Sequence, residues 1–203
     1  MSNLKYIIPI MIIVTTCHAQ HYELIGTCEG CEAIFEFGDR ELSAVDTLKD
    51  FADPGPKLKI SGIVYESDEK TPAENVILYI YHTDQDGVYP TKGDEKGWAK
   101  RHGYIRGWIK TDENGRYTFY TLKPGTYPSG SEPAHIHITL LEPDGRYYWL
   151  NSYYFADDPL LKEEDRQSSS IRGGGNNILN LKKENNLLIG IRDIILGKNV
   201  PGY

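Results

Sequence analysis

From Lys57 onward, apolar and polar residues recur in short runs that are typical of β-strands. The segment "KLKISGIVYE" (57–66) alternates between the two kinds, and "ENVILYIYHT" (74–83) is rich in β-branched and aromatic residues. Further apolar runs occupy residues 177–181 and 185–196. None of these runs has the period of an amphipathic helix.

Turn residues divide the runs into hairpins. An Asn-Gly pair divides the segment 106–122, and an Asp-Gly pair divides 134–150; both pairs favour tight turns. Only "DPLLKEEDR" (158–166) has room for one or two helical turns. Short strands separated by turns predict an all-β fold, an antiparallel β-sandwich formed by residues 57–203.

Residues 20–56 lack this alternation. They end in "DPGP", a strong breaker of regular structure. We expect them to form an irregular N-terminal arm, which could contact a partner or support a homo-oligomer, and not a separate domain.

Residues 1–19 are predicted to be an export signal. After Lys5 comes an apolar run that is too short to span a bilayer but suits the core of a signal peptide. We expect cleavage after Ala19, which leaves Gln20 first. The alternative is an imperfect lipobox, "VTTC", whose cleavage would leave Cys17 lipidated, so membrane attachment is expected only by that route. Either route predicts a protein that works outside the cytoplasm.

Export changes the interpretation of Cys28 and Cys31, which form a single C-x-x-C motif. In a reducing compartment this motif could indicate redox or zinc chemistry, but no second C-x-x-C accompanies it. In an oxidising compartment a local disulfide is favoured. We therefore expect a structural bridge between the two residues.

Composition and charge narrow the classes of function. The chain has 203 residues, a formal net charge of −7 and 39% hydrophobic residues, as expected for one globular domain. The acidic balance argues against nucleic acid as a partner, because phosphate backbones need clustered Lys and Arg. Tyrosine is frequent, with 15 residues against 5 phenylalanines. Tyrosine favours strands, and its phenolate also binds ferric iron.

Two of the six histidines, His135 and His137, lie one residue apart. The apolar residues Ala134, Ile136 and Ile138 mark this stretch as a strand, and residues i and i+2 of a strand share one face. The two imidazoles would therefore suit neighbouring positions on one metal ion. The alternative is a pair of polar residues on the wet face of an edge strand.

Two tyrosines could complete such a site. Tyr127 lies in the turn-rich "KPGTYP", and Tyr89 follows the strand predicted at 74–83. Loops at one end of a rigid sandwich commonly carry functional residues. Two phenolates and two imidazoles favour ferric iron, because zinc seldom recruits tyrosine and the ferrous facial triad uses a carboxylate. Taken singly, either tyrosine could equally be a turn or core residue.

The order of four motifs resembles the intradiol ring-cleavage dioxygenases, the protocatechuate and catechol dioxygenase family. These motifs are "VILYIYHTDQDGVYP", "RGWIKTDENGRYTFYTLKPGTYP", "PAHIH" and "YYFADDPLL", which follow one another through roughly residues 58–160. Within this family, the four motifs are most similar to those of the beta-subunit type of protocatechuate 3,4-dioxygenase. The resemblance implies a β-sandwich and a non-heme Fe(III) ion held by two tyrosines and two histidines.

Matched position by position, the implied iron ligands are Tyr89, Tyr127, His135 and His137. The resemblance also makes Tyr127 the catalytic tyrosine, which the substrate would displace and whose phenolate could then accept a catechol proton. The implied partners are a catechol-type substrate and O2. Cleavage between the two hydroxylated carbons would give a cis,cis-muconate-type diacid, without NAD, flavin or heme.

Two positions depart from the family's pattern. Glu132 stands where an arginine often precedes "PAHIH", and Ser152 stands where a glutamine is usual. Groups around the ligands tune a metal strongly, so both changes matter. Arg106 and Arg101 could supply the missing positive charge, or they could be solvated cations at a strand edge. Arg106 and Glu132 are therefore further catalytic candidates.

Two further histidines are not assigned to the metal site. His102 has no counterpart in the family, and His82 is expected to be a packing residue.

The alternative function is a non-catalytic β-sandwich module that binds a catechol-like ligand or a polysaccharide and keeps a relic metal site. The same site loaded with copper or zinc is a third possibility, which the tyrosines disfavour.

Overall fold

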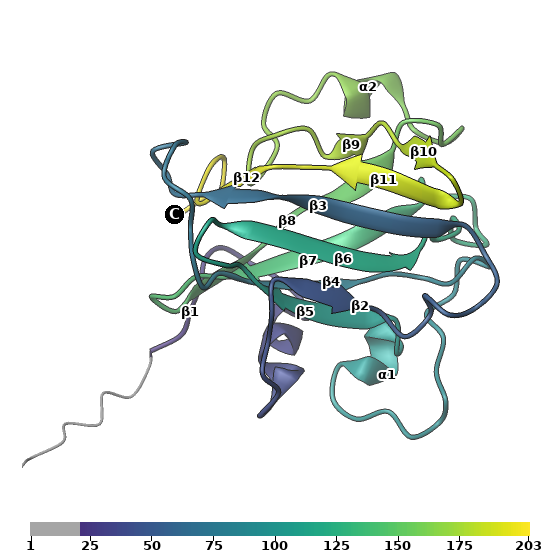
Figure 1. Ribbon diagram of the computed structural model, residues 1–203, viewed down its shortest axis with the longest axis horizontal. Helices are drawn as coiled ribbons and strands as arrows, with labels where there is room; N and C mark the ends of the chain where they lie inside the picture. The colour runs from purple at the N-terminus through teal and green to yellow at the C-terminus, as the bar shows by residue number, and fades with distance from the viewer. Residues whose placement is uncertain (1–20) are drawn as a thin grey trace, which may run out of the picture.

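The computed structural model describes residues 21–203, so the predicted signal (1–19) lies outside the described residues. Two sheets pack face to face, as the front and rear layers of strands in Figure 1 show. This arrangement confirms the all-β sandwich that the sequence predicts.

The first sheet contains the strand with the two histidines. Its central pairs are antiparallel: β7 (His135–Leu141) with β8 (Arg146–Phe155), β7 with β4 (Ile77–Tyr81), and β4 with β5 (Arg106–Lys110). In spatial order the strands are β1 (Glu23–Leu24), β8, β7, β4 and β5, and β9 (Ile178–Leu179) also pairs with β8.

The second sheet is built around the antiparallel pair of β3 (Lys57–Tyr65) and β6 (Arg116–Leu122). In spatial order its strands are β10 (Lys182–Glu184), β11 (Leu187–Ile191), β3, β6 and β2 (Val45–Thr47), and β12 (Ile194–Ile195) also pairs with β3.

Both sheets are mixed. The central pairs are antiparallel, as the hairpin signals predict, but β1, β2, β9, β11 and β12 each join a neighbour in parallel. Parallel neighbours need a crossover connection instead of a hairpin. These strands come from the two ends of the chain, where no two-residue turn links them to the strand that they join.

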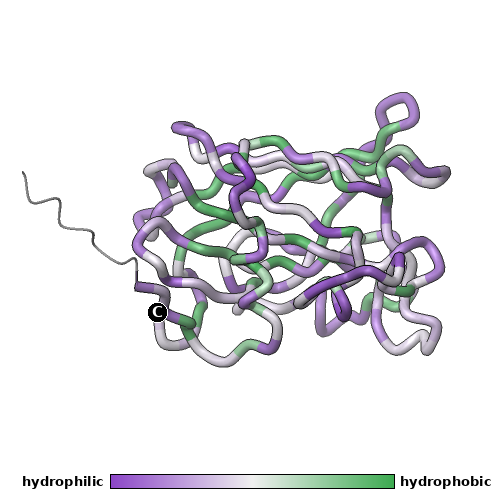
Figure 2. Tube along the Cα trace, turned by 90° about the horizontal axis from the view of Figure 1, so that it is seen from below, coloured by the Kyte–Doolittle hydropathy of each residue, from purple (hydrophilic) through white to green (hydrophobic). Residues whose placement is uncertain are grey.

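The hydrophobic core lies between the two sheets. Alternate residues of β4 and β7, such as Leu78, Ile80, Ile136 and Ile138, are buried there. Figure 2 shows apolar stretches through the middle of the molecule and polar residues along the turns. The intervening residues of the same strands, His137 among them, therefore face the other side of the first sheet.

The N-terminal segment covers that other side. Its 3-10 helix η1 (Cys31–Phe37) buries Ala33 and Ile34 against Tyr79 and Trp108, and the Trp108 indole N–H donates to the carbonyl of Ile34 (2.9 Å). The segment expected to be an irregular arm thus contributes η1, β1 and β2 to the sandwich.

Two single-turn helices complete the described chain. α2 (Glu163–Arg166) falls in the one stretch that the sequence left room for a helical turn, and α1 (Ala99–His102) lies in the loop between β4 and β5. No helix within residues 21–203 is long and apolar enough to cross a membrane.

Candidate metal centre

Four side chains converge where the loops after β4 and β6 meet the start of β7. Tyr89 Oη lies 2.7 Å from Tyr127 Oη and 2.9 Å from His137 Nε2. His135 Nε2 lies 3.1 Å from His137 Nε2 and 3.3 Å from Tyr127 Oη. The structure therefore brings together all four residues that the resemblance implies as ligands.

Close contact between two loops brings the tyrosines together. The backbone N–H of Gly125 donates to the carbonyl of Asp84 (2.8 Å). Gly87 has a φ of +76°, and a Cβ there would lie 1.7 Å from the carbonyl oxygen of Thr126. Only glycine fits such an approach, so the loop that carries one tyrosine packs directly on the loop that carries the other.

The two histidines are oriented through their Nδ1 atoms. His135 Nδ1 donates to the carbonyl oxygen of Pro133 (2.7 Å), which leaves Nε2 as the nitrogen that faces the other donors. His137 Nδ1 faces the Ser152 hydroxyl at 3.5 Å, and the ladder between β7 and β8 is irregular at His137. Both Nε2 atoms are thereby directed toward the tyrosines.

Burial sets the protonation of these groups. It is the largest cause that raises the pKa of Tyr89 far above its usual range and the pKa of Tyr127 to a smaller extent. Burial also lowers the pKa of His137 to about 3. Without a cation the phenols stay protonated and His137 stays neutral. A cation beside them would supply the opposite charge that a buried phenolate needs.

This donor set fits ferric iron. Two phenols and two imidazoles offer hard oxygen and nitrogen donors, both of which iron accepts. Across the described residues, no group of three His, Cys, Asp or Glu side chains is arranged to hold a metal. Any metal bound here would therefore depend on the tyrosines.

A cavity of about 260 Å³ opens in front of the donors. Tyr89, Tyr127 and His137 form part of its wall. The rest of the wall includes Glu29, Tyr81, Trp98, Arg101 and His102.

An aromatic stack supports one of the histidines. The ring of Tyr81 lies parallel to that of His137, with centroids 4.5 Å apart, and His102 stacks on Tyr81 at 3.8 Å. Trp98 also stacks on His102 (5.4 Å), and His102 Nδ1 is 2.9 Å from the Tyr79 hydroxyl. The sequence did not assign His102 or Tyr81 to the site. The register of β4 and β7 pairs Tyr81 with His137, but α1, which carries His102, has no periodic signal.

The structure does not bring Arg106 into the metal centre. Its guanidinium bonds the Glu36 carboxylate at 2.5 Å, and together they line a separate cavity. Arg101 does line the centre, but it is paired with the exposed Glu29. Glu132 lies beside the centre: its carboxylate is 3.9 Å from His135 Nε2, and its side chain is 56% exposed.

The remaining predicted residues have structural partners. His82 is buried, with one ring nitrogen 2.7 Å from the carbonyl of Thr83 and the other 2.7 Å from the Thr121 hydroxyl. It packs inside the protein, as expected. Cys28 and Cys31 are joined in a disulfide at the start of η1, next to Glu29 of the cavity wall.

Comparison with known proteins identifies the relatives of this fold and site. The family model described as dioxygenase matches residues 36–187, more than half of the chain. The protocatechuate 3,4-dioxygenase beta chain of Burkholderia cepacia is 32% identical over 92 residues, which are 42% of this chain and 39% of that protein. The catechol 1,2-dioxygenase of Acinetobacter baylyi is 30% identical over 132 residues, 55% of this chain and 40% of that protein. The match thus spans about two fifths of the length of each curated relative.

Solved structures share the same architecture. The dioxygenase domain of a dioxygenase–carbohydrate-binding protein fusion from Streptomyces sp. SirexAA-E superposes with a TM-score of 0.56 at 23% identity, covering 77% of this chain and 91% of that domain. At this identity the likeness shows the fold. The extent of the family match establishes that the chain belongs to the intradiol dioxygenase family.

Proposed function

We propose that this protein is a non-heme Fe(III) dioxygenase that uses O2 to cleave catechol-type rings between the two hydroxylated carbons. The product would be a cis,cis-muconate-type diacid. The observation that carries the proposal is the convergence of Tyr89, Tyr127, His135 and His137, with oxygen and nitrogen donors 2.7–3.3 Å apart. Family membership supports it, since the names of the relatives describe dioxygenases of protocatechuate and of catechol.

These four side chains would hold the iron. Ferric iron, when bound, supplies the Lewis acidity that stabilises a deprotonated catechol and makes its ring reactive toward O2. Two of these four side chains, Tyr89 and His137, contact the ring of Tyr81, which stacks on His137 and lies 5.8 Å from Tyr89 between ring centroids. We infer that they stay in place during turnover.

Tyr127 is the group that can move a proton. Burial and the charge of Glu132 raise the pKa of its hydroxyl, opposed by a hydrogen bond from Tyr89. Its phenolate, once separated from a cation, therefore takes up a proton readily and is suited to accept one from a substrate hydroxyl. The cavity of about 260 Å³ in front of it gives a single aromatic ring access to the donors.

The test is oxygen uptake with product analysis. Iron-loaded protein and catechol should consume one O2 per ring cleaved, and with ¹⁸O2 both labelled atoms should appear in a diacid. Tyr127→Phe should slow turnover by at least tenfold, because the displaced phenolate base is lost. Catechol binding without oxygen uptake would contradict the proposal and favour the non-catalytic module.

We also propose that the protein works outside the cytoplasm. The disulfide between Cys28 and Cys31 supports this, because structural disulfides persist in oxidising compartments. Mass spectrometry of the mature protein should find Gln20 at its N-terminus. A lipidated Cys17 would indicate the membrane-anchored route, and an intact Met1 in protein from its native source would contradict export.

A further inference from the structure

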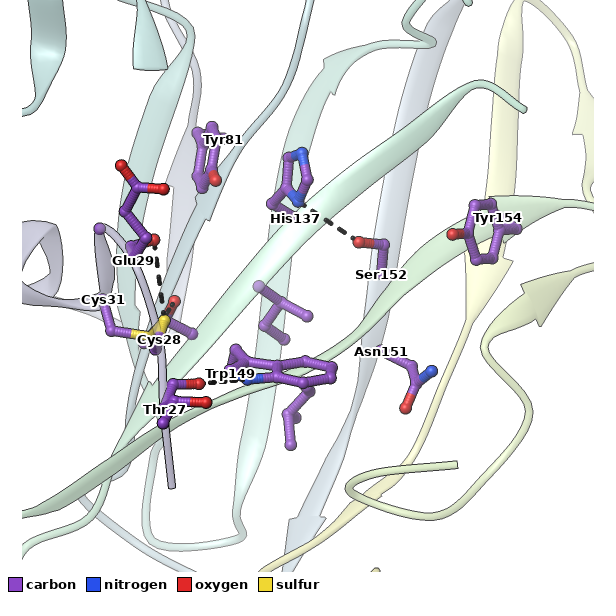
Figure 3. A pocket seen from close by; sticks show the side chains of 14 residues that line it. Thr27, Cys28, Glu29, Cys31, Tyr81, His137, Trp149, Asn151, Ser152 and Tyr154 are labelled. Carbon is purple, nitrogen blue, oxygen red and sulfur yellow. Dashed lines mark hydrogen bonds between the residues drawn. A yellow bond between two sulfur atoms is a disulfide. The ribbon is translucent and has the colours of Figure 1, made fainter. Parts of the chain in front are cut away.

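A second cavity, of about 410 Å³, lies beside the metal centre. It shares Glu29, Tyr81 and His137 with the cavity in front of the donors. Figure 3 shows it between the loop of the Cys28–Cys31 disulfide on one side and β8 on the other, with Tyr81 and His137 at one end. A ligand held at the donors would therefore have this space directly beside it.

Trp149 provides a flat surface in this cavity. Its indole N–H donates to the carbonyl of Thr27 (3.1 Å), and the guanidinium of Arg172 lies 3.7 Å from its ring centroid. These contacts fix the ring, yet the residue remains 37% exposed. Because its N–H is occupied, the indole offers a ligand apolar surface and stacking, and no further hydrogen bond.

The cavity wall is nearly free of net charge. Among the described residues that line it, Glu29 is the one acidic side chain, and it is paired with Arg101. No lysine or arginine is among the described residues of this wall, and the Arg172 guanidinium that stacks on Trp149 is itself buried, so a carboxylate there would lose water without gaining an exposed cation as a partner. Ser152 and Tyr154 add hydroxyl groups that can hydrogen-bond neutral oxygen substituents.

The combined volume of the two cavities exceeds the volume that a single aromatic ring needs. The space at the donors, about 260 Å³, is already near the lower end of volumes typical for small-molecule sites, about 300 Å³. The adjoining 410 Å³ would stay filled with water if the substrate were a single ring. A planar group attached to the catechol would displace that water and stack on Trp149.

We propose that this second cavity is a subsite for a neutral aromatic ring attached to the catechol, and that the substrates are catechols with a second planar ring. This inference rests on the proposed function, since it takes the catechol to bind at the four converging donors. Trp149 is then a specificity-determining residue.

Two measurements test the subsite. The first is kcat/KM of the iron-loaded protein for 3,4-dihydroxybiphenyl, catechol and 3,4-dihydroxybenzoate. The ring-bearing compound should be preferred over catechol by about tenfold and the carboxylate should be disfavoured. Trp149→Ala should lower the biphenyl-to-catechol ratio by about tenfold, and Trp149→Phe should restore most of it. Ile191→Ala removes an exposed apolar side chain on the second sheet and should leave the ratio unchanged.

The second measurement separates binding from turnover. The protein as purified is titrated under argon with 3,4-dihydroxybiphenyl and with catechol by calorimetry. Tighter binding of the two-ring ligand, lost in Trp149→Ala, supports the subsite even if no ring is cleaved. Equal affinity for the two ligands, or a preference that Trp149→Ala leaves intact, overturns the subsite even if catechol is a good substrate. Failure of iron binding or of oxygen uptake would count against the proposed function alone.

Discussion

Glu132 introduces a negative charge at the edge of the metal centre. Its carboxylate lies 3.9 Å from His135 Nε2, and its charge adds to the effect of burial in raising the pKa of Tyr89 and Tyr127. Arg101, which lines the cavity in front of the four donors, is already paired with Glu29. Any negative charge that builds on a substrate ring would therefore be opposed by Glu132 and not offset by a free cation.

Glu132→Arg should raise kcat/KM for catechol with no change in iron content. The side chain is 56% exposed, so solvent screens its charge. We therefore expect a gain of about threefold to tenfold, the range that follows from a screened interaction between unit charges at this distance. Steady-state kinetics with iron analysis measures it. Glu74→Arg makes the same charge change at another exposed glutamate and should leave kcat/KM unchanged. A loss of rate at constant iron content would show that Glu132 assists the reaction.

At the level of single elements, the start of η1 positions the aromatic stack beside the metal centre. Gly30 precedes this 3-10 helix with a φ of +89°, and a Cβ on it would lie 2.9 Å from His102 Nε2. His102 has little room to yield, because Tyr81 and Trp98 both stack on it. The disulfide loop and α1 therefore meet at a contact that requires glycine.

Gly30→Ala should lower the free energy of unfolding by about 2 kcal/mol. One part is the strain of alanine at positive φ, about 1 kcal/mol, and the rest is displacement of His102. Gly93→Ala is the matched control: it has a φ of +94°, close to that of Gly30, and has nothing within 4 Å of an added Cβ. Its free energy of unfolding should fall only by the contribution of backbone strain. Urea unfolding of both variants gives the difference, and equal losses would refute the contact with His102.

The elements around the metal centre differ in how well the sequence predicts them. Alternation identifies β4 and β7, and the ordered motifs identify the four converging side chains, because strand geometry fixes which residues share a face. The role of Arg106 could not be predicted, because its partner Glu36 lies in η1, which has no periodic pattern. His102 was missed for a similar reason, since α1 is a single turn whose position depends on contacts with Gly30 and Tyr79.

For the whole molecule, buried neutral histidines make the free energy of unfolding depend on pH. Burial lowers the pKa of His82, of His102 to about 4 and of His137 to about 3. The unfolded chain takes up these protons near pH 6.5, before the folded chain does, so stability falls as the pH drops below about 6.5. Burial of Glu142 raises the pKa of its carboxyl and acts in the opposite direction.

Metal-free protein should therefore have a lower free energy of unfolding at pH 5.0 than at pH 7.0. Each histidine contributes up to about 1.4 kcal/mol per pH unit within its window. Denaturant titrations at the two pH values measure the loss. His102→Gln keeps a polar partner for Tyr79 but cannot titrate, so it should reduce the difference between the two pH values. An unchanged difference in this variant would mean that His102 does not stay neutral when folded.

Iron content and the visible spectrum of the purified protein test most directly whether Tyr89, Tyr127, His135 and His137 form a ferric site. We predict one iron per chain and a broad visible band from tyrosinate-to-Fe(III) charge transfer, which makes the protein burgundy. His135→Ala and His137→Ala should each lose the iron and the band together, because each removes a nitrogen donor 3.1 Å from its neighbour. His21→Ala, at an exposed histidine, should keep both. Full iron content in both of the first two variants, or iron-replete protein without colour, would contradict the assignment.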